Sequence, residues 1–171
     1  MSKAVMLSIR PKWVEKIANG EKTIEVRKTR PKLETPFKCY IYCTLPKYPH
    51  EDFIATDYPR PQFYGGGKVI GEFTCDRIYE LAPLNHAPDD VEKQACLTRE
   101  EIVNYIKGTG YGWHISDLRI YDQPRELSEF QRATDPCDSC HAEYTWECTD
   151  CKKLGGDIKR PPQSWCYVEG G

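Results

Sequence analysis

The stretch that decides the fold is Gly20-Glu-Lys-Thr-Ile-Glu-Val-Arg27. Apolar and polar residues alternate over 23–28, which predicts a half-buried β-strand with a polar outer face. The leading glycine is placed where a helix ends with a residue in the left-handed conformation. The stretch therefore predicts a helix–turn–strand unit that brings together Lys22, Glu25 and Arg27.

The residues before this unit predict a strand followed by a helix. Residues 4–9 form a short apolar run of strand length, and Pro11 suits the first turn of a helix over 11–19. Trp13 falls on the apolar face of that helix, four residues before Ile17. We therefore expect Trp13 to pack in the core.

The rest of the chain predicts several more short strands and one more helix. Thr98-Arg-Glu-Glu101 has the pattern of a capping box, so a helix is expected to begin there. Further strands are expected at 38–44, 68–75, 112–121 and 164–168. Many short strands with few helices favour an α+β fold built on a small mixed β-barrel. At 171 residues, the chain is expected to form one domain over 1–171.

Composition excludes some classes of protein and leaves others open. The chain is 39% hydrophobic and 29% charged, which is typical of globular proteins, and its apolar runs are too short to span a membrane. The N-terminus does not resemble a signal peptide, so a cytoplasmic location is expected. Residues 1–50 hold eleven basic and four acidic side chains. That excess indicates either a polyanion-binding surface or a solvated face balanced by acids elsewhere.

The three charged residues of the deciding stretch allow several kinds of chemistry. Lys22 and Arg27 could hold a phosphate, and the guanidinium fork matches its oxygens. Glu25 could pair with either cation, accept from a nucleobase amino group or act as a general base. A salt-bridge lattice on an exposed strand face explains the same pattern.

The pattern Gly20-x-Lys22-x-x-Glu25-x-Arg27, preceded by Leu7-Ser-Ile-Arg-Pro11 and a short helix, resembles the signature of the ASCH domain family. Gly71-Glu-Phe73, the segment 112–121 and the segment 161–168 resemble later parts of phage-associated and bacterial members. The resemblance implies a PUA-like mixed β-barrel with short flanking helices. It also implies RNA binding in a cleft lined by the motif.

The resemblance implies different activities for different relatives. Some ASCH proteins are amidohydrolases that act on N4-acetylcytidine with a lysine, a threonine and a glutamate. Lys22 matches the lysine, but Glu25 occupies the threonine position, and residues 93–98 hold no counterpart of the glutamate. Other relatives are ribonucleases, for which the catalytic candidates are Lys22 and Glu25 together with Tyr42 or Tyr64.

Further basic and polar residues are candidates for the same cleft. We expect nucleic-acid contacts from the motif and its flanks: Ser8, Arg10, Lys12, Lys22, Glu25, Arg27 and Lys28. An ordinary strand–helix junction explains the flanking positions equally well. The loop 45–67 mixes aromatic and basic residues, so it could stack on single-stranded RNA or could be a packed Ω-loop. Trp113 is expected in the core, and the role of His114 is left open.

Four of the nine cysteines form a separate pattern. Cys137, Cys140, Cys148 and Cys151 have the spacing C-x2-C-x7-C-x2-C, which predicts a structural zinc site closed by four thiolates. A redox dithiol pair or an iron–sulfur cluster could use the same residues. The segment 134–155 is therefore expected to be a small zinc-knuckle insertion. The other cysteines are expected to be buried small hydrophobes.

Three functions are consistent with these patterns. The leading prediction is a protein that binds RNA or a nucleotide through Lys22, Glu25 and Arg27. A hydrolase of RNA or of a modified nucleoside would use Lys22 and Glu25 as catalysts. A zinc-stabilised adaptor would recognise protein through residues 131–160.

Overall fold

The computed structural model describes residues 2–47, 65–133 and 156–171. Most of these residues form one curved sheet of eight strands, with three short α-helices beside it. The strands are β1 (Lys3–Ile9), β2 (Ile24–Arg27), β3 (Phe37–Cys43), β4 (Lys68–Glu80), β5 (Tyr111–Arg125), β6 (Gln131–Arg132), β7 (Gly156–Asp157) and β8 (Trp165–Glu169). The helices are α1 (Pro11–Ala18), α2 (Val91–Ala95) and α3 (Arg99–Ile106), with short 3-10 turns at Leu84–His86 and Leu127–Glu129.

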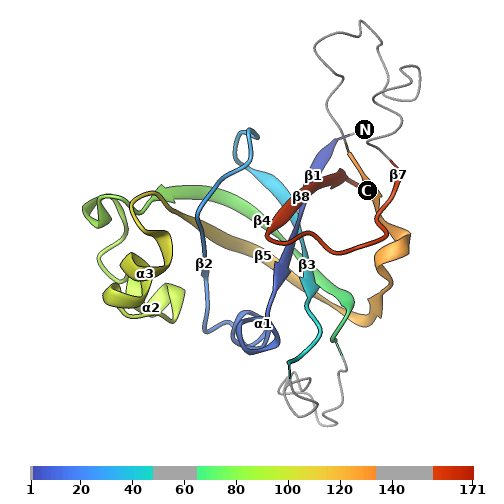
Figure 1. The fold of residues 1–171 in the computed structure, drawn as a ribbon, viewed down its shortest axis with the longest axis horizontal. Coiled ribbons are helices and arrows are strands. Elements are labelled where there is room, and N and C mark those ends of the chain that lie inside the picture. Colours follow the sequence, from blue (N-terminus) through green and yellow to red (C-terminus); the bar gives the residue numbers. More distant parts are fainter. Residues whose placement is uncertain (1, 48–64, 134–155) are drawn as a thin grey trace, which may run out of the picture.

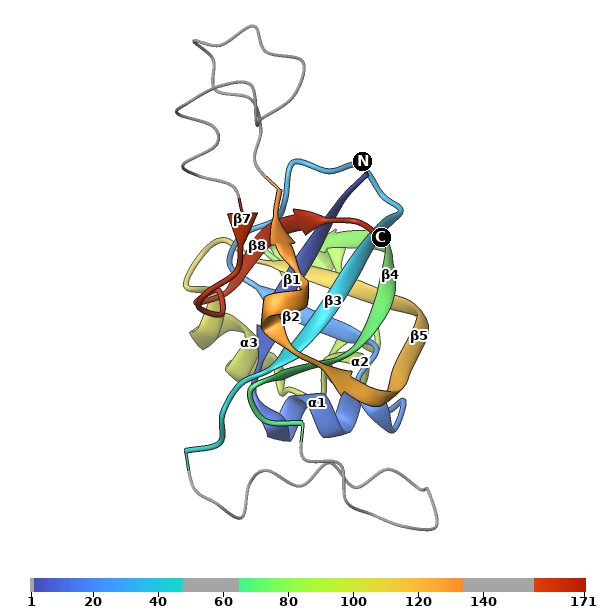
Figure 2. The same ribbon diagram turned by 90° about the vertical axis from the view of Figure 1, so that its right-hand side faces the viewer.

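The strand order in the sheet is β2-β5-β4-β3-β1-β8-β6-β7. Only the β1–β3 pair is parallel, and the other pairs are antiparallel. Figure 1 shows β4 and β5 running across the molecule, with α2 and α3 at one end beside β2. Figure 2 shows the same sheet from the side, with α1 below it and β8 beside its partner β1.

The α+β prediction is correct, but the sheet is not closed into a barrel. Within the described residues, the terminal strands β2 and β7 pair with β5 and β6 and not with each other. The parallel β1–β3 pair requires a crossover, and α1 and β2 lie in that connection. Sequence periodicity does not reveal which terminal strands meet, so closure could not be decided from alternation alone.

The core is divided between the two faces of the sheet and the helical end. Alternate residues of β1 and β3 enter opposite clusters: Leu7 and Ile41 pack with α1, whereas Met6 and Tyr40 pack with Phe130. A third cluster joins β2 to α2 and α3. The third cluster therefore packs β2, a terminal strand of the sheet, against the two helices.

Two local predictions are confirmed at the start of the chain. Helix α1 begins at Pro11, and Gly20 follows it with φ +74°, a conformation that glycine adopts without steric cost. Thr98 caps α3 in a reciprocal capping box with Glu101. Among the described helices, none is both long enough and apolar enough to cross a membrane.

Candidate functional site

A pocket of about 690 Å³ opens where α1, β2, α3 and the segment before β8 meet. Its lining includes side chains from all four elements, so it depends on contacts between distant parts of the chain. The lining residues are Ser8, Ile9, Arg10, Trp13, Lys22, Glu25, Val26, Arg27, Thr44, Leu97, Glu101, Tyr105, Pro161, Pro162 and Gln163.

Lys22 lies almost completely buried in the wall of this pocket, with 2% of its surface exposed. Its Nζ donates to the carbonyl oxygen of Ala95 at 2.7 Å and lies 3.4 Å from Oε2 of Glu25. It also lies 5.1 Å from the centre of the Trp13 ring. The buried ammonium is thus held by an acceptor, a carboxylate and an aromatic face.

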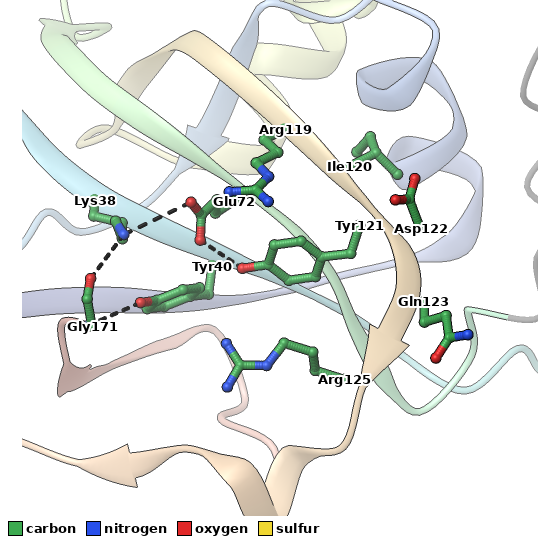
Figure 3. Close-up of a pocket in the computed structure, with 10 residues that line it drawn as sticks. All are labelled: Lys38, Tyr40, Glu72, Arg119, Ile120, Tyr121, Asp122, Gln123, Arg125 and Gly171. Atoms are coloured by element: carbon green, nitrogen blue, oxygen red, sulfur yellow. Dashed lines mark hydrogen bonds and ion pairs between the residues drawn. The ribbon is translucent and has the colours of Figure 1, made fainter.

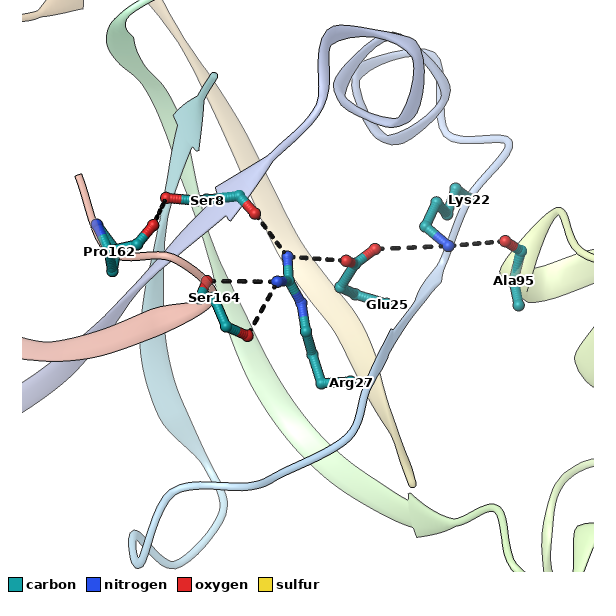
Figure 4. Close-up of polar contacts among 7 residues, drawn as sticks. All are labelled: Ser8, Lys22, Glu25, Arg27, Ala95, Pro162 and Ser164. Atoms are coloured by element: carbon teal, nitrogen blue, oxygen red, sulfur yellow. Dashed lines mark hydrogen bonds and ion pairs between the residues drawn. The ribbon is translucent and has the colours of Figure 1, made fainter. Parts of the chain in front are cut away.

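Glu25 and Arg27 lie on the same face of β2 and form a close ion pair. Nη2 of Arg27 lies 2.9 Å from Oε1 of Glu25, and the same nitrogen donates to the carbonyl oxygen of Ser8 at 2.9 Å. Nη1 of Arg27 donates to the carbonyl and hydroxyl oxygens of Ser164, each at 3.3 Å. Figure 4 shows the guanidinium reaching from β2 to both β1 and the segment before β8.

Ser8 also holds the segment 161–164 in place, through its own hydroxyl. Its hydroxyl donates to the carbonyl oxygen of Pro162 at 2.6 Å (Figure 4). Ser8 and Arg27 together therefore hold residues 161–164 against the pocket. These polar contacts form one wall of the pocket out of two segments far apart in the sequence.

The triad Lys22–Glu25–Arg27 carries two cations and one carboxylate in a buried position. Each Glu25 oxygen faces one cation, so the carboxylate is occupied on both sides. One cation of the triad is not neutralised within it, so the pocket wall favours an anionic or electron-rich ligand.

The polar face of the deciding strand is thus buried, whereas the alternation predicted an exposed face. All four residues of β2 are buried, and the side that carries Glu25 and Arg27 is in contact with β1 and with the segment 161–164. The alternative interpretation, a salt-bridge lattice on an exposed strand face, is wrong because these side chains are buried. Alternation reports side-chain character, and it could not report covering groups supplied by distant residues.

Comparisons with known proteins find one matching family model. Residues 7–44 match the model of the ASCH domain. Over that segment the chain is similar to the ASCH family. No curated protein matches the chain.

The crystal structure of the ASCH protein from Zymomonas mobilis and those of two of its single-residue variants resemble the whole chain. A tyrosine-to-phenylalanine variant aligns with TM-score 0.60 at 18% identity, covering 98% of this chain and 91% of that one. A serine-to-alanine variant gives 0.58 at 17% identity, covering 97% and 88%. The unsubstituted protein gives 0.57 at 17% identity, covering 97% and 87%. These similarities show a shared fold.

The flanking residues predicted for the cleft are distributed around the pocket. Arg10 is exposed and lines it. Lys12 lies over the Trp13 ring at 4.7 Å from its centre, and Lys28 lies over the ring of Tyr105 at 5.2 Å. Both rings line the pocket, so the two lysines border it through aromatic neighbours.

Trp13 differs from its prediction. The ring is only partly buried and lines the pocket, where Lys12 and Lys22 both lie near it. Its position on the apolar face of α1 correctly predicted contact with the core, but that face continues into the pocket. Trp113, by contrast, is fully buried as predicted, in edge contact with Phe37.

Tyr42, one of the predicted catalytic tyrosines, is not brought to the pocket. It is 5% exposed, packs in the second core cluster, and burial raises the pKa of its hydroxyl. Tyr64 and the greater part of the 45–67 loop lie outside the described residues. His114 pairs with Asp76 at 2.6 Å, and neither residue lines the pocket.

The four cysteines Cys137, Cys140, Cys148 and Cys151 also lie outside the described residues. Over residues 2–47, 65–133 and 156–171, no group of three or more His, Cys, Asp or Glu side chains is arranged to hold a metal. Cys39, Cys43 and Cys75 are buried as predicted, whereas Cys96 and Cys166 are partly exposed.

Two lining residues of the pocket come from α3 and were not predicted. Glu101 and Tyr105 lie four positions apart, and so they share one face of that helix. The capping box predicted the helix, but it assigned Glu101 only a local role. Ser164 and Gln163 were likewise missed, because nothing in their local sequence indicates contact with β2.

A second pocket of about 520 Å³ lies over β3, β4 and β5. Figure 3 shows the Tyr121 hydroxyl meeting Glu72, which also faces Lys38. The hydroxyl donates to Oε2 of Glu72 at 2.6 Å, and Nζ of Lys38 lies 3.7 Å from Oε1. This outer cluster, Lys38–Glu72–Tyr121, is more exposed than the buried triad.

Proposed function

We propose that this protein binds single-stranded RNA or a nucleotide in the pocket lined by Lys22, Glu25 and Arg27. One observation carries the proposal: the buried, positively charged triad and the aromatic rings of Trp13 and Tyr105 line the same pocket. Cationic and aromatic groups together are what unpaired nucleotides require, because phosphates need counter-charge and bases need a surface to stack on.

The proposed roles divide between the wall and the rim. Lys22, Glu25 and Arg27 shape the wall, and Ser8 fixes the segment that closes it. Arg10, Lys12 and Lys28 are exposed and supply phosphate contacts at the rim. Exposed cations can neutralise phosphates without breaking internal pairs, so they are the better candidates for the salt-dependent part of binding.

The ion pairs that Lys22 and Glu25 already form favour a binding function over hydrolysis. A general base needs a free lone pair near the substrate, and both oxygens of Glu25 already face cations. Lys22 is likewise engaged by Ala95, Glu25 and Trp13. The adaptor alternative depends mainly on residues outside the described ranges.

Fluorescence anisotropy with a labelled single-stranded RNA 12-mer tests the proposal. The wild-type protein should bind, with affinity falling as salt rises from about 50 to 200 mM. Arg10→Gln should weaken binding and make the logarithmic salt slope shallower by about 0.7, the value for one phosphate contact to a single strand. Arg119→Gln is the matched control, because Arg119 is exposed beside the second pocket.

Two results would overturn this function. One is the absence of binding by the wild-type protein. The other is an equal loss of affinity in both variants, which would indicate attraction by general charge. Competition by a nucleoside monophosphate against the 12-mer distinguishes a single-nucleotide ligand from an extended strand.

We further propose that Cys137, Cys140, Cys148 and Cys151 hold a structural zinc ion. The support is their spacing and the preference of zinc for four thiolates. Metal analysis of protein purified without added zinc should find about one equivalent. A content below about half an equivalent would refute the site.

A further inference from the structure

The pocket contains two carboxylates, and only one is free to meet a ligand. Both Glu25 oxygens face cations. Glu101 on α3 accepts from the backbone N–H of Thr98 through Oε2 at 2.8 Å, and it also interacts with the Thr98 side chain. A carboxylate has about four acceptor sites on its two oxygens, and neither oxygen of Glu101 is in an ion pair among the described residues. Glu101 is therefore the lining carboxylate with spare capacity to accept a hydrogen bond.

Its setting keeps Glu101 ionised. The hydrogen bond from the backbone N–H of Thr98 is the main reason that the pKa of Glu101 lies below its ordinary value. The Thr98 side chain and, to a smaller extent, Lys12 lower the pKa of Glu101 further. At neutral pH the side chain is an acceptor only, so it can meet donors such as amino groups but not carbonyl oxygens.

Tyr105 lies one helical turn beyond Glu101 on the same face of α3. Its side chain is 43% exposed and lines the pocket. Residues four apart on a helix have Cβ atoms about 5–6 Å from each other. A base stacked on the Tyr105 ring would therefore have its hydrogen-bonding edge within reach of Glu101.

We propose that Glu101 and Tyr105 form the base-reading edge of the pocket, which selects nucleobases with an exocyclic amino group over uracil. This inference rests on the proposed function and names the ligand class for the same pocket. Cytosine, adenine and guanine each present an amino donor, whereas uracil presents carbonyl oxygens and one ring N–H. Uracil carries an oxygen where cytosine carries its amino group, and its ring N–H is flanked by two carbonyl oxygens, so the carboxylate would meet at least one repulsive oxygen.

Binding of single-stranded oligonucleotides tests the proposal. The probes are an oligouridine 8-mer and the same 8-mer carrying three central cytidines. The wild-type protein should bind the cytidine-containing probe at least about five-fold more tightly, the lower end expected for one specific contact to a base. Glu101→Gln should reduce that ratio to below about two-fold, because a carboxamide offers both a donor and an acceptor.

The variant keeps the fold, because glutamine at this position also closes a capping box. Glu100→Gln is the matched control: it removes the same charge one residue away, on an exposed side chain that does not line the pocket. That control should retain the wild-type ratio. Tyr105→Leu should weaken both probes by a similar factor, because stacking is tolerant of sequence.

The outcomes separate the two proposals. If the wild-type protein binds neither probe, the proposed function fails and this inference fails with it. If it binds both equally, or if Glu101→Gln retains the preference, the base-reading edge is refuted while RNA binding stands. Loss of the preference in both Glu101→Gln and Glu100→Gln would also refute it, since net charge would then be the cause.

Discussion

The buried triad on β2 and the outer cluster over β3, β4 and β5 use similar groups in different surroundings. Each places a glutamate between two partners: Glu25 between Lys22 and Arg27, and Glu72 between Lys38 and Tyr121. The side chains of the triad are 2–9% exposed. Those of Lys38 and Glu72 are 39% and 20% exposed.

This difference in exposure determines what each cluster can contribute. Water screens the outer pair, so its free energy is small. The triad was removed from water when the chain folded, and only its internal partners compensate for that cost. The stability of the fold therefore depends on the intact triad, which also shapes the pocket. Substitutions in the outer cluster should have little effect on stability.

The largest expected effect is that of Glu25→Gln. It leaves Lys22 and Arg27 buried without a counter-charge, so the free energy of unfolding should fall by about 3–5 kcal/mol. Urea denaturation measures this change. The matched Glu72→Gln variant should lose no more than about 1 kcal/mol. Equal losses in the two variants would show that burial does not distinguish the clusters.

A smaller effect is expected from Arg27→Lys. The variant keeps the positive charge but loses the fork that reaches Glu25, Ser8 and Ser164 at once. The free energy of unfolding should fall by about 2–3 kcal/mol, as expected when charged hydrogen bonds are lost. Arg119→Lys at the outer pocket should change it by less than about 0.5 kcal/mol. An Arg27→Lys variant as stable as the wild type would show that a positive charge at this position is enough to stabilise the fold without the guanidinium's hydrogen bonds.

The smallest effect concerns alkaline pH at the outer cluster. Burial, and then the hydrogen bond to Glu72, raise the pKa of Tyr121 above its ordinary value. The folded state therefore keeps this proton to a higher pH than the unfolded state does. Because the unfolded state alone loses the proton just above about pH 10, stability should fall as pH rises beyond that value. Urea midpoints at increasing alkaline pH should fall less steeply for Tyr121→Phe. Parallel declines in the two proteins would contradict this assignment.

Much of the local structure could be predicted, because it depends on nearby residues. Pro11 correctly predicted the start of α1, and Gly20 correctly predicted the turn that follows it. Thr98 and Glu101 correctly predicted the start of α3. Strand β5 extends to Arg125, beyond the predicted end near Tyr121, because its pairing with β4 continues through irregularities in register. Pairing partners override local preference in sheets.

The candidate site was only partly predictable, for a different reason. Lys22, Glu25 and Arg27 were found because they lie within eight residues of sequence. Glu101, Tyr105 and Gln163 reach the pocket through the packing of α3 and of the segment before β8. Contacts between residues so far apart in the chain cannot be inferred from the local pattern of apolar and polar residues.

The link between Arg27 and Ser164 joins residues 137 positions apart. A ribosome adds about 5–20 residues per second, so β2 emerges roughly 7–27 s before its last partner is made. During that interval the nascent chain carries the whole family motif but lacks one wall of the pocket. Ligand binding should therefore begin only after translation has supplied the final strand.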